Sequence, residues 1–161
     1  MSTSGFYRIL SLDGGGIRGL ITAVLLQRLE AAVPGFLEQI DLFAGTSTGG
    51  LLALGLASGK TPAEAIRLYV EYGKQVFADS LWDQVRDLGT LIGAEYDLEP
   101  LREALQTLFG EMTLGDLPRR ALISSFDLDY QSADPAQPRS WKAKFFHNFP
   151  GPGSDQAQRV V

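Results

Sequence analysis

Two glycine-rich stretches decide the fold of this chain: "SLDGGGIRG" at residues 11–19 and "FAGTSTGG" at residues 43–50. Each follows a short apolar run, at residues 6–12 and 40–45, of the kind that forms a buried strand. Each also precedes a helical pattern, which begins near Ile17 in the first case and at Thr48 in the second. A strand, a glycine turn and a helix therefore follow one another twice, which predicts an α/β domain with a mainly parallel sheet.

The remainder of the chain continues this alternation. Thr61, Pro62 and Glu64 stand at the cap, first and third positions of a capping box, which predicts a helix beginning at Pro62. A further helix is expected after Asp97. Strands are predicted within residues 119–128 and 140–149.

Apolar spacing predicts which residues of the helices face the core. In the first helix these are Ile17, Leu20, Ile21, Val24 and Leu25. In the helix that follows Thr61 they are Ile66, Tyr69, Val70, Gly73 and Phe77. In the helix after Asp97 they are Leu98, Leu101, Leu105 and Leu108.

Composition limits the classes of function. The 161 residues are 45% hydrophobic and 20% charged, which suits one globular domain over residues 1–161. The net charge of −5, without a basic patch, argues against nucleic acid as a partner. Because the chain has no cysteine and one histidine, His147, we expect no metal site and no disulfide. The N-terminus lacks the apolar core of a signal peptide and no membrane span is predicted, so we expect a soluble, cytoplasmic protein.

The first glycine stretch has two interpretations. Gly14, Gly16 and Gly19 match G-x-G-x-x-G between a strand and a helix, as in dinucleotide-binding oxidoreductases. That interpretation needs an acidic residue at the end of the second strand, whereas Asp41 stands at its start. The other interpretation is an anion-binding turn, because glycine N–H groups before a helix N-terminus can hold a negative oxygen. The chain has no Gly-Lys-Ser/Thr, which excludes a P-loop.

The second glycine stretch contains Gly45-Thr46-Ser47-Thr48-Gly49, a match to G-x-S-x-G. Between a strand and a helix, this pattern is typical of a nucleophile elbow, in which the serine is strained and its Oγ projects from the sheet edge. Neighbouring backbone comes so close that Gly45 and Gly49 must lack side chains. We expect both glycine turns at the carboxyl edge of one sheet, where a nucleophile and an oxyanion hole together perform acyl transfer.

Together the two motifs resemble those of the patatin-like phospholipases, which are lipid acyl hydrolases. The stretches "YDLEPLREALQTLFGEMTLGDL", "ALISSFDLDYQ" and "KFFHNFPG" follow the family's order of elements, so the resemblance covers nearly the whole chain. It implies a three-layer α/β/α patatin-like fold and a Ser–Asp dyad without histidine. It also implies a lipid or phospholipid substrate, met at a membrane or micelle surface, and no cofactor. The resemblance gives no information about protein partners.

The resemblance assigns roles by position. Ser47 would be the nucleophile, and the oxyanion hole would be formed by Gly14, Gly15 and Gly16. Arg18 fits the basic position of the glycine motif, where it stabilises the turn or meets a phosphate. The other motif glycines are Gly19, Gly45 and Gly49.

The chain departs from the family at the dyad aspartate. That aspartate belongs to a later Asp-Gly-Gly or Asp-Gly-Ala, but the only Asp-Gly here is Asp13-Gly14. The chain thus resembles the N-terminal part of a patatin domain, truncated at its C-terminal side, and we expect it to be weakly active or inactive alone. The spacing of Asp127, Asp129 and Asp155 does not support any of them as a replacement, and His147 fits a structural role better than that of a base.

Two assignments stay open. Residues of the irregular stretch 79–97 either line an acyl-chain entrance or belong to the core. They are Leu81, Trp82, Leu88, Leu91 and Ile92. The chain as a whole is an acyl hydrolase, a dinucleotide-binding oxidoreductase domain, or a non-catalytic patatin-like fragment.

Overall fold

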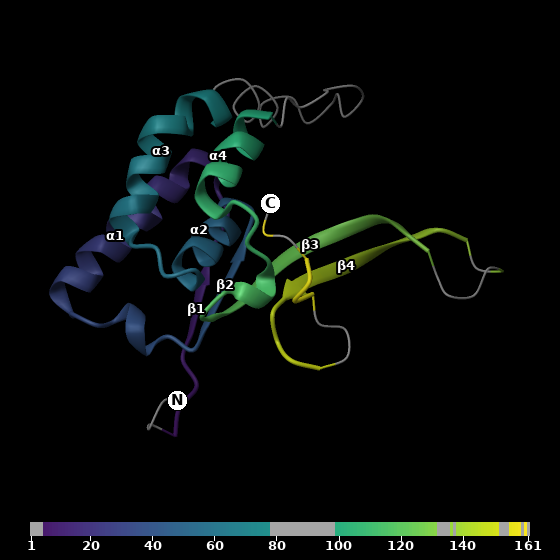
Figure 1. Cartoon of the computed structure of the whole chain (residues 1–161), viewed down its shortest axis with the longest axis horizontal. Coiled ribbons are helices and arrows are strands. Elements are labelled where there is room, and N and C mark those ends of the chain that lie inside the picture. Colours follow the sequence, from purple (N-terminus) through teal and green to yellow (C-terminus); the bar gives the residue numbers. More distant parts are fainter. Residues whose placement is uncertain are drawn as a thin grey trace.

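The computed structural model describes residues 5–77, 99–131, 136, 138–151, 155–158 and 160. Strands β, α-helices α and 3-10 helices η follow one another along the chain (Figure 1). Their order is β1 (Ile9–Leu12), η1 (Gly16–Arg18), α1 (Gly19–Ala32), η2 (Leu37–Gln39), β2 (Leu42–Thr46), α2 (Thr48–Ala57), α3 (Pro62–Phe77), α4 (Glu99–Phe109), η3 (Leu114–Asp116), β3 (Arg120–Tyr130) and β4 (Ser140–His147).

The strands form one four-stranded sheet in the order β1-β2-β3-β4. β1, β2 and β3 are parallel, with Leu12 opposite Gly45 and Thr46 opposite Ser124, whereas β4 is antiparallel to β3. The predicted α/β class with a mainly parallel sheet is therefore confirmed. Since β1 and β2 are parallel neighbours, the glycine loop after β1 and Ser47 after β2 lie at the same edge of the sheet.

The helices cover the sheet through α2. This helix packs against β1, β2 and β3, while α1 and α3 pack against α2, and α4 packs against α3. α2 is buried on nearly all sides because its sequence, "TGGLLALGLA", has no charged residue. Phe43, only 1% exposed, lies in the resulting core with Leu12 and Ala121 from the neighbouring strands.

The predicted helices are present, but the inner faces of two differ from the prediction. In α1, Ile21 and Leu25 are 61% and 59% exposed, and the buried residues are Gly19, Ala23 and Leu26. α1 has apolar residues around most of its circumference, so spacing alone could not select the buried side. In α3, Ile66 and Tyr69 pack against the core as predicted, but Val70 is 67% exposed.

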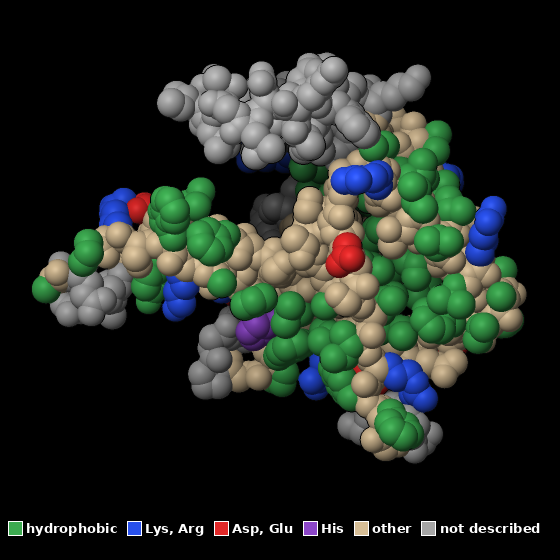
Figure 2. All heavy atoms as spheres, turned by 180° about the vertical axis from the view of Figure 1, so that it is seen from behind, with side chains coloured by type: hydrophobic (Ala, Val, Ile, Leu, Met, Phe, Trp, Pro, Cys, Tyr) green, Lys and Arg blue, Asp and Glu red, His purple; other side chains and the backbone are tan. Residues whose placement is uncertain are grey.

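The β3–β4 hairpin extends away from the helical body (Figure 1). β3 pairs with β2 only over Arg120–Ser124 and continues with β4 alone to Tyr130. Hydrophobic side chains follow this projecting part (Figure 2), and four of its large ones are exposed. They are Phe126, Leu128, Trp141 and Phe145.

Short contacts tie the C-terminal residues to the body. The N–H groups of Leu114 and Gly115 donate to the carbonyls of Gln158 and Gln156, both at 2.8 Å, and Val160 N–H donates to Met112 O at 2.9 Å. Val160 is partly buried against the core. Within the described residues, no helix is both long enough and apolar enough to cross a bilayer.

Candidate active site

Ser47 stands at the abrupt turn from β2 into α2. Its backbone has φ 54° and ψ −128°, and it is the only non-glycine residue with positive φ in the described part of the chain. A non-glycine residue keeps such a conformation only where its surroundings impose it, and such strain gathers at active sites. The Ser47 side chain is exposed, as a nucleophile that must meet a substrate requires.

The glycines on either side of Ser47 allow the turn to be this tight. A Cβ atom on Gly45 would collide with the backbone of Gly49 and Gly50. A Cβ atom on Gly49 would collide with the carbonyl oxygen of Leu12 and the backbone of Asp13. The end of β1 is therefore packed directly against the elbow, which brings the glycine loop beside it.

Gly14 is the part of that loop nearest to Ser47. A Cβ atom on Gly14 would lie 2.9 Å from Ser47 Cβ and 2.8 Å from the carbonyl oxygen of Thr46. The backbone of Gly14 therefore lies directly beside Ser47, with no room for a side chain between them. An ester carbonyl next to Ser47 would be within reach of this backbone.

The amides of the loop differ in what they contact. Gly15 N–H donates to Thr48 Oγ1 at 3.2 Å, so this amide is engaged inside the protein. Among the described residues, no acceptor receives a hydrogen bond from the N–H of Gly14 or Gly16. These two amides, together with the N–H of Thr48 at the first position of α2, are the donors that an oxyanion near Ser47 could use.

Arg18 closes the loop at the start of α1. Its backbone N–H and its Nε both donate to Gly15 O, at 3.1 and 3.3 Å. The side chain is exposed, so the guanidinium also faces solvent. Arg18 therefore stabilises the turn, and its remaining donors are positioned at the surface beside it.

The three aspartates considered as a base have other partners. Asp127 accepts a hydrogen bond from Asp129 N–H at 3.0 Å, and Asp129 forms an ion pair with Arg139 at 2.6 Å. Asp155 accepts from Lys144 Nζ at 2.7 Å. Burial raises the pKa of Asp155, but its hydrogen bonds, first that from Lys144, lower the pKa more, so it lies below its usual range. Within the described residues, no carboxylate forms a hydrogen bond with Ser47.

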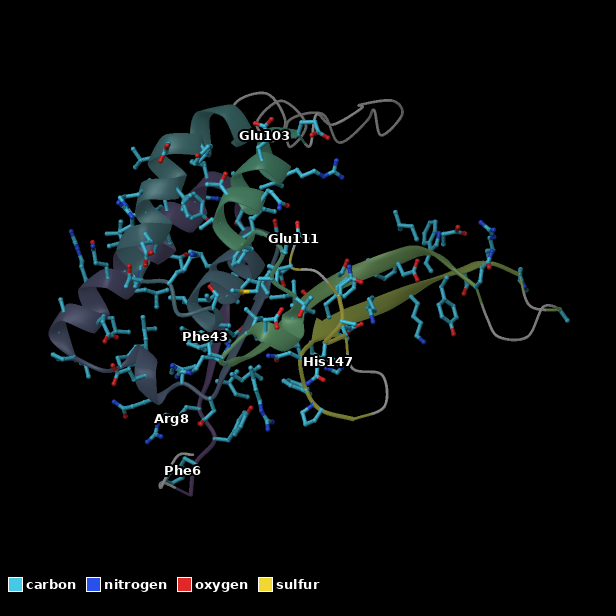
Figure 3. The ribbon with its side chains drawn as sticks, viewed as in Figure 1. Phe6, Arg8, Phe43, Glu103, Glu111 and His147 are labelled. Atoms are coloured by element: carbon cyan, nitrogen blue, oxygen red, sulfur yellow. The ribbon has the colours of Figure 1, made fainter. Side chains whose placement is uncertain are left out.

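His147 lies at the base of the hairpin, where β4 ends (Figure 3). Its Nδ1 accepts the N–H of Phe149 at 3.3 Å, and its ring stacks on the Phe149 ring with centroids 4.8 Å apart. These contacts give His147 a structural role in the turn after β4.

Asp41 lies at the wrong edge of the sheet to bind the ribose of a dinucleotide. It precedes β2, and its carboxylate accepts the N–H of Arg8 at 2.7 Å, just before β1. Asp41 is therefore at the amino ends of the strands, opposite the glycine turns. The geometry gives no support to a dinucleotide site.

An apolar cavity of about 90 Å³ lies between α2, α3 and α4. Leu51 is one of its lining residues and lies one helical turn beyond Ser47, whose carbonyl accepts the Leu51 N–H at 3.1 Å. Its walls include Leu56, Leu68 and Leu105. The five residues of stretch 79–97 that either line an acyl-chain entrance or belong to the core lie outside the described residues.

The sequence predicts no role at the site for two residues that lie next to it, Thr48 and Tyr69. The sequence predicts Thr48 only as the start of a helix, yet this residue is 5% exposed and its hydroxyl contacts the glycine loop. The sequence predicts Tyr69 only on the core face of α3, and its hydroxyl in addition approaches both Thr48 and Gly19. The one signal in the sequence for such a role is the threonine directly after the elbow serine, because a hydroxyl that is buried there needs a hydrogen-bond partner.

Comparisons with known proteins identify the family of this chain. The family model of the patatin-like phospholipases matches residues 10–158. A cGAMP-activated phospholipase of Escherichia coli (strain TW11681) is 36% identical over 130 residues, which cover 75% of this chain and 36% of that protein. A cGAMP-activated phospholipase of Pseudomonas aeruginosa is 40% identical over 118 residues, covering 73% of this chain and 35% of that protein. Patatin-17 of Solanum cardiophyllum is 33% identical over 135 residues, covering 74% and 33%.

This chain therefore spans about a third of the length of these curated relatives. The match to the family model nevertheless extends over nearly all of its residues, from β1 to the segment after β4. The chain belongs to the patatin-like phospholipase family.

Proposed function

We propose that this chain carries the nucleophile and the oxyanion hole of a lipid acyl hydrolase that cleaves carboxylic esters of phospholipids or related lipids. The observation that carries the proposal is the contact between Gly14 and the strained Ser47, at one edge of the sheet. The apolar cavity lined by Leu51 favours a substrate with an acyl chain over a small polar ester. Such a substrate is met at a membrane or micelle surface.

The reaction starts with attack of Ser47 Oγ on the ester carbonyl carbon. The serine proton passes to a carboxylate, for which the resemblance implies an aspartate. The carbonyl oxygen becomes an oxyanion held by N–H groups of the glycine loop and of Thr48. Collapse of this intermediate releases the alcohol portion of the lipid with the proton and leaves an acyl-serine, which water hydrolyses to a fatty acid and free Ser47.

The positive end of α2 supports the same chemistry. Ser47 immediately precedes the first turn of this ten-residue helix, where the helix dipole favours negative charge on the attacking oxygen and on the oxyanion. We further infer that Gly14 and Gly16 are the loop residues that meet the oxyanion, because the Gly15 amide donates to Thr48.

The 161-residue chain by itself is expected to turn over esters weakly or not at all. No carboxylate or imidazole of the described residues is bonded to Ser47, so the serine has no base there to take its proton. Ester turnover by this chain at the rate of a full-length patatin-like enzyme would contradict this expectation.

The test is active-site labelling with a fluorophosphonate probe, followed by mass spectrometry. We expect slow labelling on Ser47 alone, and its complete loss in Ser47→Ala. Ser125→Ala is the matched control, because Ser125 is an exposed serine on β3 of the same sheet, and it should label as the unaltered chain does. Equal labelling of Ser47→Ala, or modification at another residue, would contradict the assignment of the nucleophile.

A further inference from the structure

Thr48 is the first residue of α2 and follows Ser47 directly, but its side chain turns inward. It is 5% exposed, and a hydroxyl buried to this degree is costly unless it is hydrogen-bonded. Its Oγ1 accepts the N–H of Gly15 at 3.2 Å, across 33 residues of sequence. This bond joins the middle of the glycine loop to the elbow.

Tyr69 reaches the same place from α3. Burial raises the pKa of its hydroxyl, and the neighbouring Thr48 side chain acts in the opposite direction. The hydroxyl also packs against the start of α1, where a Cβ atom on Gly19 would collide with it. The Tyr69 hydroxyl therefore sits between the first residue of α1 and the first residue of α2.

Tyr69, Thr48 and Gly15 therefore follow one another: Gly15 N–H donates to Thr48 Oγ1, and the Tyr69 hydroxyl lies beside the Thr48 side chain. A threonine hydroxyl has one proton and two lone pairs, so it can accept from Gly15 and hydrogen-bond with Tyr69 at once. Gly15 lies between Gly14, which touches Ser47, and Gly16, which begins η1. Holding the Gly15 amide therefore sets the direction in which the two adjacent amides point.

We propose that Thr48 and Tyr69 are positioning residues, which fix the glycine loop so that the amides of Gly14 and Gly16 face the substrate carbonyl at Ser47. The proposal rests on the proposed function, since it describes how the same oxyanion hole is held in place. It gives Gly15 a holding role and assigns oxyanion binding to its neighbours. Neither Thr48 nor Tyr69 touches the reacting atoms.

The experiment compares Thr48→Val, Thr48→Ser and Tyr69→Phe. Thr48→Val keeps the shape but removes the hydroxyl, Thr48→Ser restores the hydroxyl, and Tyr69→Phe removes the second member of the chain. Tyr130→Phe is the matched control, because it removes a tyrosine hydroxyl from β3, in the part of the hairpin that pairs with β4 alone. Two quantities are measured in the full 161-residue chain: the fluorophosphonate labelling rate of Ser47, and the exchange rate of the Gly15 amide proton by NMR.

We expect Gly15 exchange to become roughly 3- to 10-fold faster in Thr48→Val, which corresponds to the loss of one hydrogen bond. Thr48→Ser should restore the original rate, and Tyr69→Phe should give a smaller increase. Labelling should fall about tenfold in Thr48→Val, less than the 100- to 1000-fold loss typical of removing a direct oxyanion donor. Tyr130→Phe should change neither quantity.

Unchanged Gly15 exchange in Thr48→Val would overturn the proposal, and so would faster exchange with an unchanged labelling rate. If the unaltered chain does not label at all, the proposed function fails on that measurement. The exchange rates then still decide the positioning of the loop, because they do not depend on activity. A loss of labelling that Thr48→Ser does not rescue would indicate damage to packing, and would also overturn the proposal.

Discussion

At the scale of single residues, the site depends on glycines, because a residue without a Cβ atom lets two backbone segments come close together. Glycine at position 14 lets the loop approach Ser47, and a methyl group there would meet Ser47 Cβ at 2.9 Å and the Thr46 carbonyl oxygen at 2.8 Å. Both are shorter than ordinary carbon contacts, and neither neighbour is the end of a flexible side chain. The loop or the elbow would have to move.

Gly14→Ala should therefore reduce the rate of Ser47 labelling by at least about 100-fold, since displacement of the loop removes its oxyanion donors together. Gly55→Ala is the matched control, because Gly55 lies in α2 and a methyl group there meets nothing within 4 Å. It should stabilise the fold by about 0.5–1 kcal/mol through helix propensity. Urea unfolding and the rate of Ser47 labelling are measured for both variants. Equal labelling rates in Gly14→Ala and Gly55→Ala would contradict the contact between Gly14 and Ser47.

At the scale of elements, α3 shows how a local motif starts a helix. The N–H and hydroxyl of Thr61 donate to Glu64 Oε2 at 2.7 and 2.8 Å, and Glu64 N–H donates to Thr61 Oγ1 at 3.3 Å. The predicted capping box is thus confirmed. It matters to the site because α3 carries Tyr69, and the position of that hydroxyl depends on where the helix begins.

Thr61→Ala should lower the free energy of unfolding by about 1 kcal/mol at pH 7, because it removes an N-cap hydroxyl. Thr107→Ala, an exposed change within α4, should alter it by less than about 0.5 kcal/mol. Urea denaturation of each variant gives the comparison. A Thr61→Ala variant as stable as the unaltered chain would show that the box adds nothing to tertiary packing.

The same box makes stability depend on pH. Hydrogen bonds from the backbone and then the side chain of Thr61 lower the pKa of Glu64 from its ordinary 4.5. A lowered folded pKa means that the contribution is complete above pH 4.5 and is lost as the pH falls through the folded value. The difference between Thr61→Ala and the unaltered chain should therefore shrink in acid. A difference that stays constant from pH 7 to pH 3 would contradict this account.

At the scale of the whole molecule, the two faces of the sheet differ. Phe43 on β2 and its neighbour Leu10 on β1 face the helices, whereas Ile9, the next residue along β1, faces the other side. Phe43 is 1% exposed and Ile9 is 59% exposed. Figure 3 shows Phe43 within the body of the molecule, away from the projecting hairpin. Stability therefore comes from the face that α2 covers.

Phe43→Ala should lower the free energy of unfolding by about 3–5 kcal/mol, because it leaves a cavity in the core. Ile9→Ala should cost less than about 1 kcal/mol, since most of that side chain already meets solvent. Thermal and urea unfolding measure both changes. Similar losses in the two variants would mean that the second face is buried as well.

The sequence by itself determined the α/β class, the capping box and the two glycine turns, because each depends on neighbours within a few positions. Steric freedom of glycine, strand runs and cap residues are local properties, readable in order along the chain. Only the tertiary structure decided which side of α1 is buried, since that helix is apolar on most sides. It also decided that Gly15 donates to Thr48 and that Tyr69 reaches both glycine turns, because these contacts join residues distant in sequence through packing.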